Sequence, residues 1–307
     1  MTWIVIALVA TLLWSITNFI DKLLLERFVP ERSTALVFGI YPAVFSLIFL
    51  PFLFYFNPHA LDADLINIVL FLFAGGLEIT AIIFYLRALQ HEDTSTVVPF
   101  FQAVPVFSFI LGFFLLGEML SIPQILSGVG IVMGGILLSY EFNKGASRRF
   151  RLPLIIWMLS ASFCYALFDA VFKFGALRED YWTAIVWQHT GIVLTAVGLL
   201  AFRKRYRERF IEIVRNGGRT VFAINISNEG IYATGIMLSN YALLLAPIAL
   251  VSLITAYHPA FVFIIGLLLT LFAPRLLKEE ITKKRLLIKA LAITLMLTSS
   301  IFLILNS

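Results

Sequence analysis

The residues best suited to chemistry in this chain are two acids set in apolar sequence. Glu78 lies near the middle of the apolar stretch 65–89, and Glu229 near the middle of the stretch 220–244. In a membrane helix rising about 1.5 Å per residue, both would sit close to mid-depth. A carboxyl there costs about 2.5–3.5 kcal/mol, so it needs a reason. Each is expected to hold a proton or an amine; the alternative is a structural acid bonded to a neighbouring Asn or Tyr.

Further polar candidates occur at helical spacing. Asp169 and Lys173 are four residues apart, which puts them on one helix face as an ion pair, or as a gate near one end of the span. Asn18 and Lys22 repeat this spacing, and Asn228 directly precedes the second acid. The alternative for both lysines is that they extend to the membrane interface. Asn18, Asp169 and Asn228 are therefore candidate substrate-binding residues.

Two prolines and two histidines lie inside apolar stretches. Pro259 frees a backbone carbonyl, which is tolerated where the backbone faces protein or a cavity, so the adjacent His258 is a cavity candidate. Pro105 and Pro259 are expected to act as hinges, and His189 as a packed, hydrogen-bonded residue. The histidines lack metal-binding spacing and a cysteine companion, so no metal and no cofactor are expected.

Aromatic residues offer a further set of candidates. Tyr85, Trp187 and Tyr257 could line a pocket and stack on a ring or a cation. Aromatic residues make up 15% of the chain, so contact with lipid or with packing partners is the alternative for each.

The elements that must position these residues are membrane helices. The chain is 61% hydrophobic and 13% charged, with a mean hydropathy of +0.96, whereas soluble domains are about 25% charged. A spanning helix needs about 20 apolar residues. Ten stretches are predicted to span, giving an all-α integral membrane protein: 3–23, 33–56, 65–89, 95–117, 123–140, 152–174, 182–202, 220–244, 247–272 and 286–305.

One stretch of sequence occurs twice. Residues 88–112 align without a gap with residues 242–266, so that Pro105 falls on Pro259 and Gly112 on Gly266. The chain is therefore predicted to consist of two five-helix repeats, residues 1–140 and 152–307, joined by a basic linker at 141–151. Because five is odd, tandem copies have opposite orientations, and such inverted repeats bind substrate near the midplane between them.

The basic residues are segregated along the chain. All but two of the 23 lysines and arginines, Lys173 and Arg178, fall on the side of the loops that follow odd-numbered helices. By the positive-inside rule, those loops are cytoplasmic and both termini are extracytoplasmic, in a plasma or inner membrane. The basic run at 203–209 is expected to touch lipid headgroups rather than nucleic acid.

A series of short motifs follows in a fixed order and partly repeats. The motifs are Trp14-Ser15, Tyr85-Leu-Arg87-Ala88-Leu, Pro105, Leu-Gly117-Glu118-Met-Leu-Ser and Gly128-Val-Gly130, with a looser second copy, Asn240-Tyr241-Ala242-Leu243, Pro259 and Glu279-Glu280-Ile281-Thr282. This series resembles the drug/metabolite transporter superfamily, and within it the EamA-type ten-helix carriers. The resemblance implies transport of a small polar or amphipathic metabolite, often as export, with proton coupling or exchange. Family members are usually pictured with cytoplasmic termini, and the charge pattern here predicts the reverse.

The favoured hypothesis is a secondary active transporter of an amine, amino acid or cationic solute, working by alternating access as a monomer or homodimer in the bilayer, with protons or a counter-substrate. One alternative is an anion exchanger for phosphorylated or nucleotide-linked sugars, using Lys22, Arg87 and Lys173. A membrane-embedded enzyme is less favoured, because the sequence has no metal spacing and no nucleotide loop. A non-transporting lipid-binding or scaffold protein would leave the buried acids unexplained.

Overall fold

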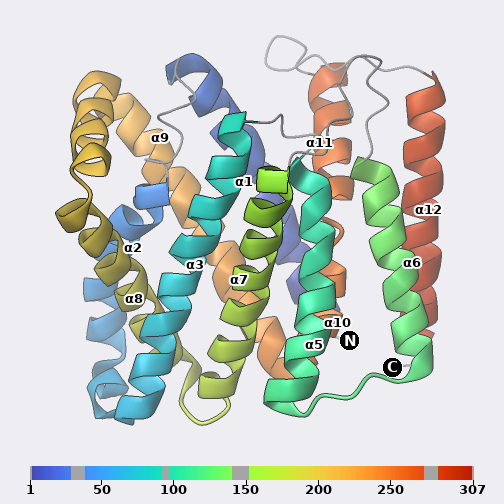
Figure 1. Cartoon of the computed structure of the whole chain (residues 1–307), viewed down its shortest axis with the longest axis horizontal. Helices are drawn as coiled ribbons and strands as arrows, with labels where there is room; N and C mark the ends of the chain where they lie inside the picture. The colour runs from blue at the N-terminus through green and yellow to red at the C-terminus, as the bar shows by residue number, and fades with distance from the viewer. Residues whose placement is uncertain (1, 29–38, 92–96, 140–151, 273–282, 306–307) are drawn as a thin grey trace.

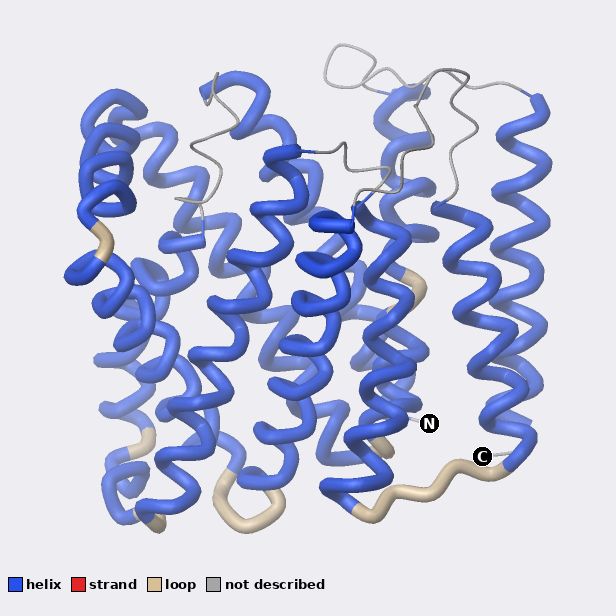
Figure 2. Tube along the Cα trace, viewed as in Figure 1, coloured by secondary structure: helices blue, strands red, loops and turns tan. Residues whose placement is uncertain are grey.

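The computed structural model describes residues 2–28, 39–91, 97–139, 152–272 and 283–305, and these residues form helices joined by short loops, without a strand (Figures 1 and 2). By length and composition, seven segments in this part of the chain are able to cross a membrane, and two shorter apolar helices accompany them. The prediction of an all-α, multi-pass membrane protein is therefore confirmed.

The observed helices overlap the predicted apolar stretches, and two of those stretches, 95–117 and 247–272, are each divided into two helices. In the first part of the chain these are α1 (Thr2–Phe28), α2 (Tyr41–Phe56), α3 (Leu65–His91), η3 (Val98–Ala103), α5 (Val104–Leu116) and α6 (Ile122–Ser139), with the short η2 (Pro58–Asp62) before α3. The second part holds α7 (Leu152–Ala176), α8 (Tyr181–Phe202), α9 (Lys204–Leu245), α10 (Ile248–Thr255), α11 (His258–Phe272) and α12 (Lys283–Leu305).

A helix break interrupts both copies of the repeated stretch at the same place. α5 begins at Val104 and α11 at His258, positions that correspond in the repeat, and the next residue in each case is proline. Proline lacks an N–H and fits the first turn of a helix, where that N–H would have no partner. The predicted hinge prolines thus stand where a helix restarts.

The two breaks are also in contact with each other. Gln102, just before one restart, donates its Nε2 hydrogen to the carbonyl oxygen of Ala256 at the other break, at 3.3 Å. Positions 102 and 256 correspond in the repeat. The Gln102 side chain is only 3% exposed, so this bond satisfies its amide N–H deep in the bundle, while the amide oxygen Oε1 has no hydrogen-bond partner among the described residues.

Close backbone approach fixes the relation of α3 to α8. A methyl group at Gly75 would collide with the backbone carbonyl of Gln188, and one at Gly191 would collide with the backbone of Leu72. Small residues of this kind let membrane helices pack backbone to backbone. The largest buried cluster surrounds this contact and includes Phe71 on α3.

Helix α9 is two segments joined by a bend. Gly218 has φ 66° and ψ −177°, a conformation that favours glycine, and the helix continues on both sides of it. The segment before Gly218 carries the charged residues from Lys204 onward and lies at the end of the bundle opposite the termini (Figure 1). The segment after the bend contains the predicted stretch 220–244.

Candidate functional site

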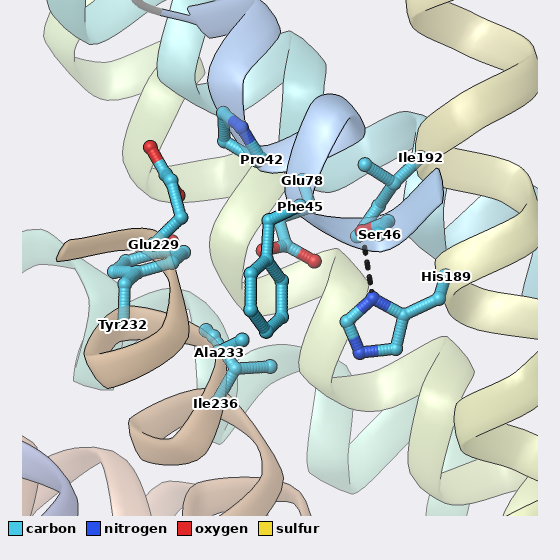
Figure 3. Close-up of a pocket in the computed structure, with 10 residues that line it drawn as sticks. All are labelled: Pro42, Phe45, Ser46, Glu78, His189, Ile192, Glu229, Tyr232, Ala233 and Ile236. Carbon is cyan, nitrogen blue, oxygen red and sulfur yellow. Dashed lines mark hydrogen bonds between the residues drawn. The ribbon is translucent and has the colours of Figure 1, made fainter. Parts of the chain in front are cut away.

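A narrow pocket lies where α2, α3, α8 and α9 meet (Figure 3). It has room for about one water-sized group. Both glutamates predicted from the sequence line it. In Figure 3 the Phe45 ring points into the pocket, with Glu229 and Tyr232 to one side and His189 to the other. Its lining residues are Pro42, Phe45, Ser46, Glu78, His189, Ile192, Glu229, Tyr232, Ala233 and Ile236.

Glu78 is held by a chain of side-chain amides. Gln188 donates its Nε2 hydrogen to Glu78 Oε2 at 3.0 Å, and Asn240 donates its Nδ2 hydrogen to Gln188 Oε1 at 2.8 Å. All three side chains are buried. The chain runs from α9 through α8 to α3, and the backbone contact at Gly75 sets the position of Gln188. Glu78 thus has one fixed partner and one carboxylate oxygen, Oε1, without a hydrogen-bond partner among the described residues.

Glu229 has no hydrogen bond or ion pair within the described ranges. It interacts electrostatically with Glu78 and with Asp21 of α1. Asp21 itself accepts a hydrogen bond from Asn228 Nδ2 at 2.6 Å. The predicted binding residue Asn228 therefore orients a carboxyl of α1, while the adjacent Glu229 faces the pocket.

Asp169 lies near the same group of acids. It interacts electrostatically with Glu78 across the contact between α7 and α3. It makes no ion pair with Lys173, so of the two roles considered for these residues the intrahelical pair is wrong. The physical reason is that the carboxylate of Glu118, from the loop after α5, binds the lysine instead.

Lys173 forms its ion pair with Glu118, and we call this pair the latch. The Nζ atom of Lys173 lies 2.6 Å from Glu118 Oε1 and donates a second bond to Ala246 O at 2.7 Å. The other carboxylate oxygen of Glu118 accepts from the backbone N–H of Ile248 at 2.8 Å. Gly117, with φ 66°, turns the chain so that Glu118 can reach these partners. The latch joins the loop after α5 to α7 and to the start of α10.

Asn18, a candidate binding residue, and His258, the cavity candidate, contact each other. Asn18 Nδ2 lies 2.6 Å from His258 Nε2 and 2.9 Å from the carbonyl oxygen of Trp14. Ser15 Oγ lies 3.5 Å from the carbonyl oxygen of His258. This contact ties α1 to the restart of the helix at α11.

The predicted aromatic candidates have packing partners outside the pocket lining. Trp187 donates its Nε1 hydrogen to Ala60 O at 2.8 Å, and Tyr257 Oη lies 2.8 Å from Ser300 Oγ. The ring of Tyr85 lies 5.2 Å from that of Phe101. The aromatic rings in the pocket wall are those of Phe45 and Tyr232.

Sequence reasoning missed several members of the site. Asp21 stands beside Lys22 at the end of its apolar stretch, where an acid is expected at the membrane interface. The side chain of Lys22 itself lies outside the described residues. Gln188 and Ser46 carry no charge, so their position in apolar sequence did not mark them as site residues. Across the described residues, no group of three His, Cys, Asp or Glu side chains is placed to hold a metal ion.

Comparison with known proteins finds a family match for one part of the chain. Residues 1–140 match the model of the EamA-like transporter family, which confirms the resemblance for this part. The chain is also similar to a solved crystal structure, whose description states no function. The TM-score is 0.66 at 18% sequence identity, and the match covers 98% of this chain and 96% of the other. At that identity the likeness shows a shared fold. No curated protein matches the chain.

Proposed function

We propose that this chain, whose residues 1–140 match the EamA-like transporter family, moves a small amine, amino acid or other cationic solute across a membrane in exchange for protons. One observation carries the proposal: four carboxyls inside the bundle, Asp21, Glu78, Asp169 and Glu229, which we call the acidic cluster. They interact electrostatically in a series, and none of them forms an ion pair with a described lysine or arginine.

Like charges gathered inside a membrane protein are unfavourable unless something neutralises them. Protons can do so when the site is empty, and an ammonium group can do so when it is occupied. A site that alternates between the two states exchanges one for the other, which is antiport. With protons entering as the amine leaves, the carrier would act as an exporter, as the family resemblance implies.

The packing of the helices supports the predicted inverted repeat, and with it alternating access. α3, in the first predicted repeat, packs against α7, the first helix of the second. α9, the counterpart of α3, packs in the same way against α1, the counterpart of α7. The helix breaks at Val104 and His258 correspond, and Gln102 contacts Ala256 at the corresponding position. Two halves related in this way can rock about a site between them.

The latch supports a gate at the end of the bundle that carries the termini. It links the loop after α5 in the first repeat with α7 and α10 in the second. Opening that end requires the two halves to separate there, so we propose that the bond between Lys173 and Glu118 breaks and re-forms in each cycle.

The anion exchanger fits the described residues less well. Such a carrier needs cationic side chains available inside its cavity. Lys173 is neutralised by Glu118, and the side chain of Arg87 is exposed. The pocket itself is lined by two acids.

The proposal is tested by thermal unfolding of the purified full-length protein with amines, amino acids, sugar phosphates and nucleotide sugars. A ligand at 100 times its Kd stabilises the folded state by about 2.7 kcal/mol. We expect amines or amino acids to stabilise the protein, Glu229→Gln to abolish the effect, and Glu208→Gln, at an exposed position of α9, to leave it intact. Stabilisation by phosphorylated compounds alone would contradict the proposal.

A transport assay tests the coupling. In proteoliposomes containing a pH indicator, an amine gradient should drive proton movement in the opposite direction. Glu78→Gln and Glu229→Gln should each abolish that movement. If both variants keep the flux and its pH dependence unchanged, the acidic cluster is not the coupling site.

We also propose that the charged end of the bundle faces the cytoplasm, which puts both termini on the opposite side. The charged start of α9 lies at the end opposite the termini (Figure 1), which supports this orientation. A C-terminal reporter that is active only in the cytoplasm should be silent; activity would reverse the assignment.

A further inference from the structure

The pocket contains a histidine whose two ring nitrogens have different surroundings. His189 Nδ1 lies 2.8 Å from Ser46 Oγ, and both side chains are buried. His189 Nε2 is also buried and has no hydrogen-bond partner among the described residues. Figure 3 shows Ser46 against one ring nitrogen and the other nitrogen turned away from it.

The contacts of Ser46 decide which nitrogen carries the proton. Hydroxyls elsewhere in the helices commonly donate to the carbonyl four residues earlier, as Thr11 does to Ala7 and Thr190 does to Val186. Ser46 makes no such bond within the described residues, and its hydroxyl has one acceptor in reach, Nδ1 of His189. A buried hydroxyl left without an acceptor is unfavourable, so Ser46 donates to Nδ1 and the neutral ring carries its hydrogen on Nε2.

His189 therefore presents an N–H donor with no acceptor in the part of the chain that the structure describes. His189 lines the same pocket as Glu78 and Glu229, and its side chain is only 3% exposed. Buried donors in folded proteins are almost always paired, with protein, water or ligand. The pocket thus combines two acids, which suit a cation, with a donor that suits a hydrogen-bond acceptor.

We propose that the pocket, which here has room for about one water-sized group, widens when the substrate binds. The substrate then carries an uncharged oxygen acceptor as well as its amine, and this oxygen accepts a hydrogen bond from His189 Nε2. This inference rests on the proposed function and narrows its substrate class to amino alcohols and related hydroxyl- or carbonyl-bearing amines. A carboxylate acceptor fits less well, because it would lie in a pocket lined by Glu78 and Glu229.

The test uses two amines that differ in one group. Ethanolamine and propylamine have the same length, and the terminal hydroxyl of the first is a methyl group in the second. Their affinities are measured by ligand-dependent thermal stabilisation of the purified full-length protein. We expect ethanolamine to bind about three- to tenfold more tightly, the difference of one neutral hydrogen bond.

Variants at the donor separate binding from folding. His189→Phe should abolish the preference for ethanolamine while keeping the affinity for propylamine. His189→Gln retains an N–H donor and should keep part of the preference for ethanolamine. Ser46→Ala should reduce the preference, because the ring proton is then free to move to Nδ1. His59→Phe, at an exposed position, should leave the preference unchanged. The melting temperature without ligand shows whether each variant folds.

The outcomes distinguish this inference from the function on which it rests. If no amine or amino acid stabilises the wild-type protein, the proposed function fails; if others do but ethanolamine does not, the function stands and this inference is wrong. If both bind equally well, or if His189→Phe folds and keeps the preference, the amine carrier stands and the role of His189 is wrong. Tighter binding of glycine than of ethanolamine would overturn the preference for an uncharged acceptor.

Discussion

Replacing Lys173 by methionine is expected to destabilise the protein by about 3–5 kcal/mol, because Glu118, whose side chain is only 13% exposed, would remain without its cation. Methionine has about the length of the lysine stem, so the change removes the ammonium group and keeps most of the packing. The backbone carbonyl of Ala246 would lose its donor at the same time.

The contacts of the latch set this magnitude. Lys173 Nζ donates to Glu118 Oε1 at 2.6 Å and to Ala246 O at 2.7 Å, and the two charged side chains are 9% and 13% exposed. A hydrogen bond involving a charged group contributes about 1.5–3 kcal/mol, so two of them give about 3–6 kcal/mol. Adding Glu118→Gln to Lys173→Met should recover part of the loss, because no buried charge then remains.

Equilibrium unfolding of the purified protein in mixed micelles provides the measurement. Lys204→Met is the matched control, because Lys204 pairs with Glu208 at 3.5 Å on an exposed helix face, where such pairs contribute about 0.3–0.5 kcal/mol. If Lys173→Met lies within about 1 kcal/mol of the wild type, then the latch is not a net stabilising contact and the argument from its two bonds is refuted.

Two further substitutions, Gly191→Ala and Gln188→Leu, probe the contact between α3 and α8, and Gly198→Ala serves as the control for the first. Gly191→Ala should lower the melting temperature markedly, because the added methyl group collides with the backbone of Leu72, whereas Gly198→Ala meets nothing within 4 Å and should leave it unchanged. Equal melting temperatures for the two would contradict the close approach. Gln188→Leu removes the donor to Glu78, and we expect a loss of about 1–3 kcal/mol in unfolding free energy together with weaker amine binding; unaltered binding would mean that the position of Glu78 does not depend on Gln188.

Helix positions were predictable because membrane insertion depends on local hydropathy. The predicted stretch 65–89 corresponds to α3, Leu65–His91, and the predicted stretch 152–174 corresponds to α7, Leu152–Ala176. Pro105 and Pro259 also indicated where the helix restarts, since proline acts on its own turn. These features depend on residues close together in the chain.

Partner choice was not predictable from spacing. Asp169 and Lys173 satisfy the helical spacing of an ion pair, yet Lys173 binds Glu118, whose carboxylate is already oriented by the backbone N–H of Ile248. Asp21 lies at the end of its apolar stretch, and only the fold brings it to Asn228. Both outcomes depend on tertiary distances, which short-range patterns do not contain.

The bond from Gln102 to Ala256 has a consequence for biosynthesis. Its two residues are 154 positions apart, so at about 5–20 residues per second the ribosome makes the second about 8–30 s after the first. In the same way, Gln188, the hydrogen-bond partner of Glu78, is synthesised 110 residues after it. During this interval, the newly inserted first half has polar side chains whose partners are still being translated. Because unpaired polar side chains are unfavourable in lipid, we expect the nascent chain to remain beside the insertion machinery, where water can hydrate them, until its second half emerges.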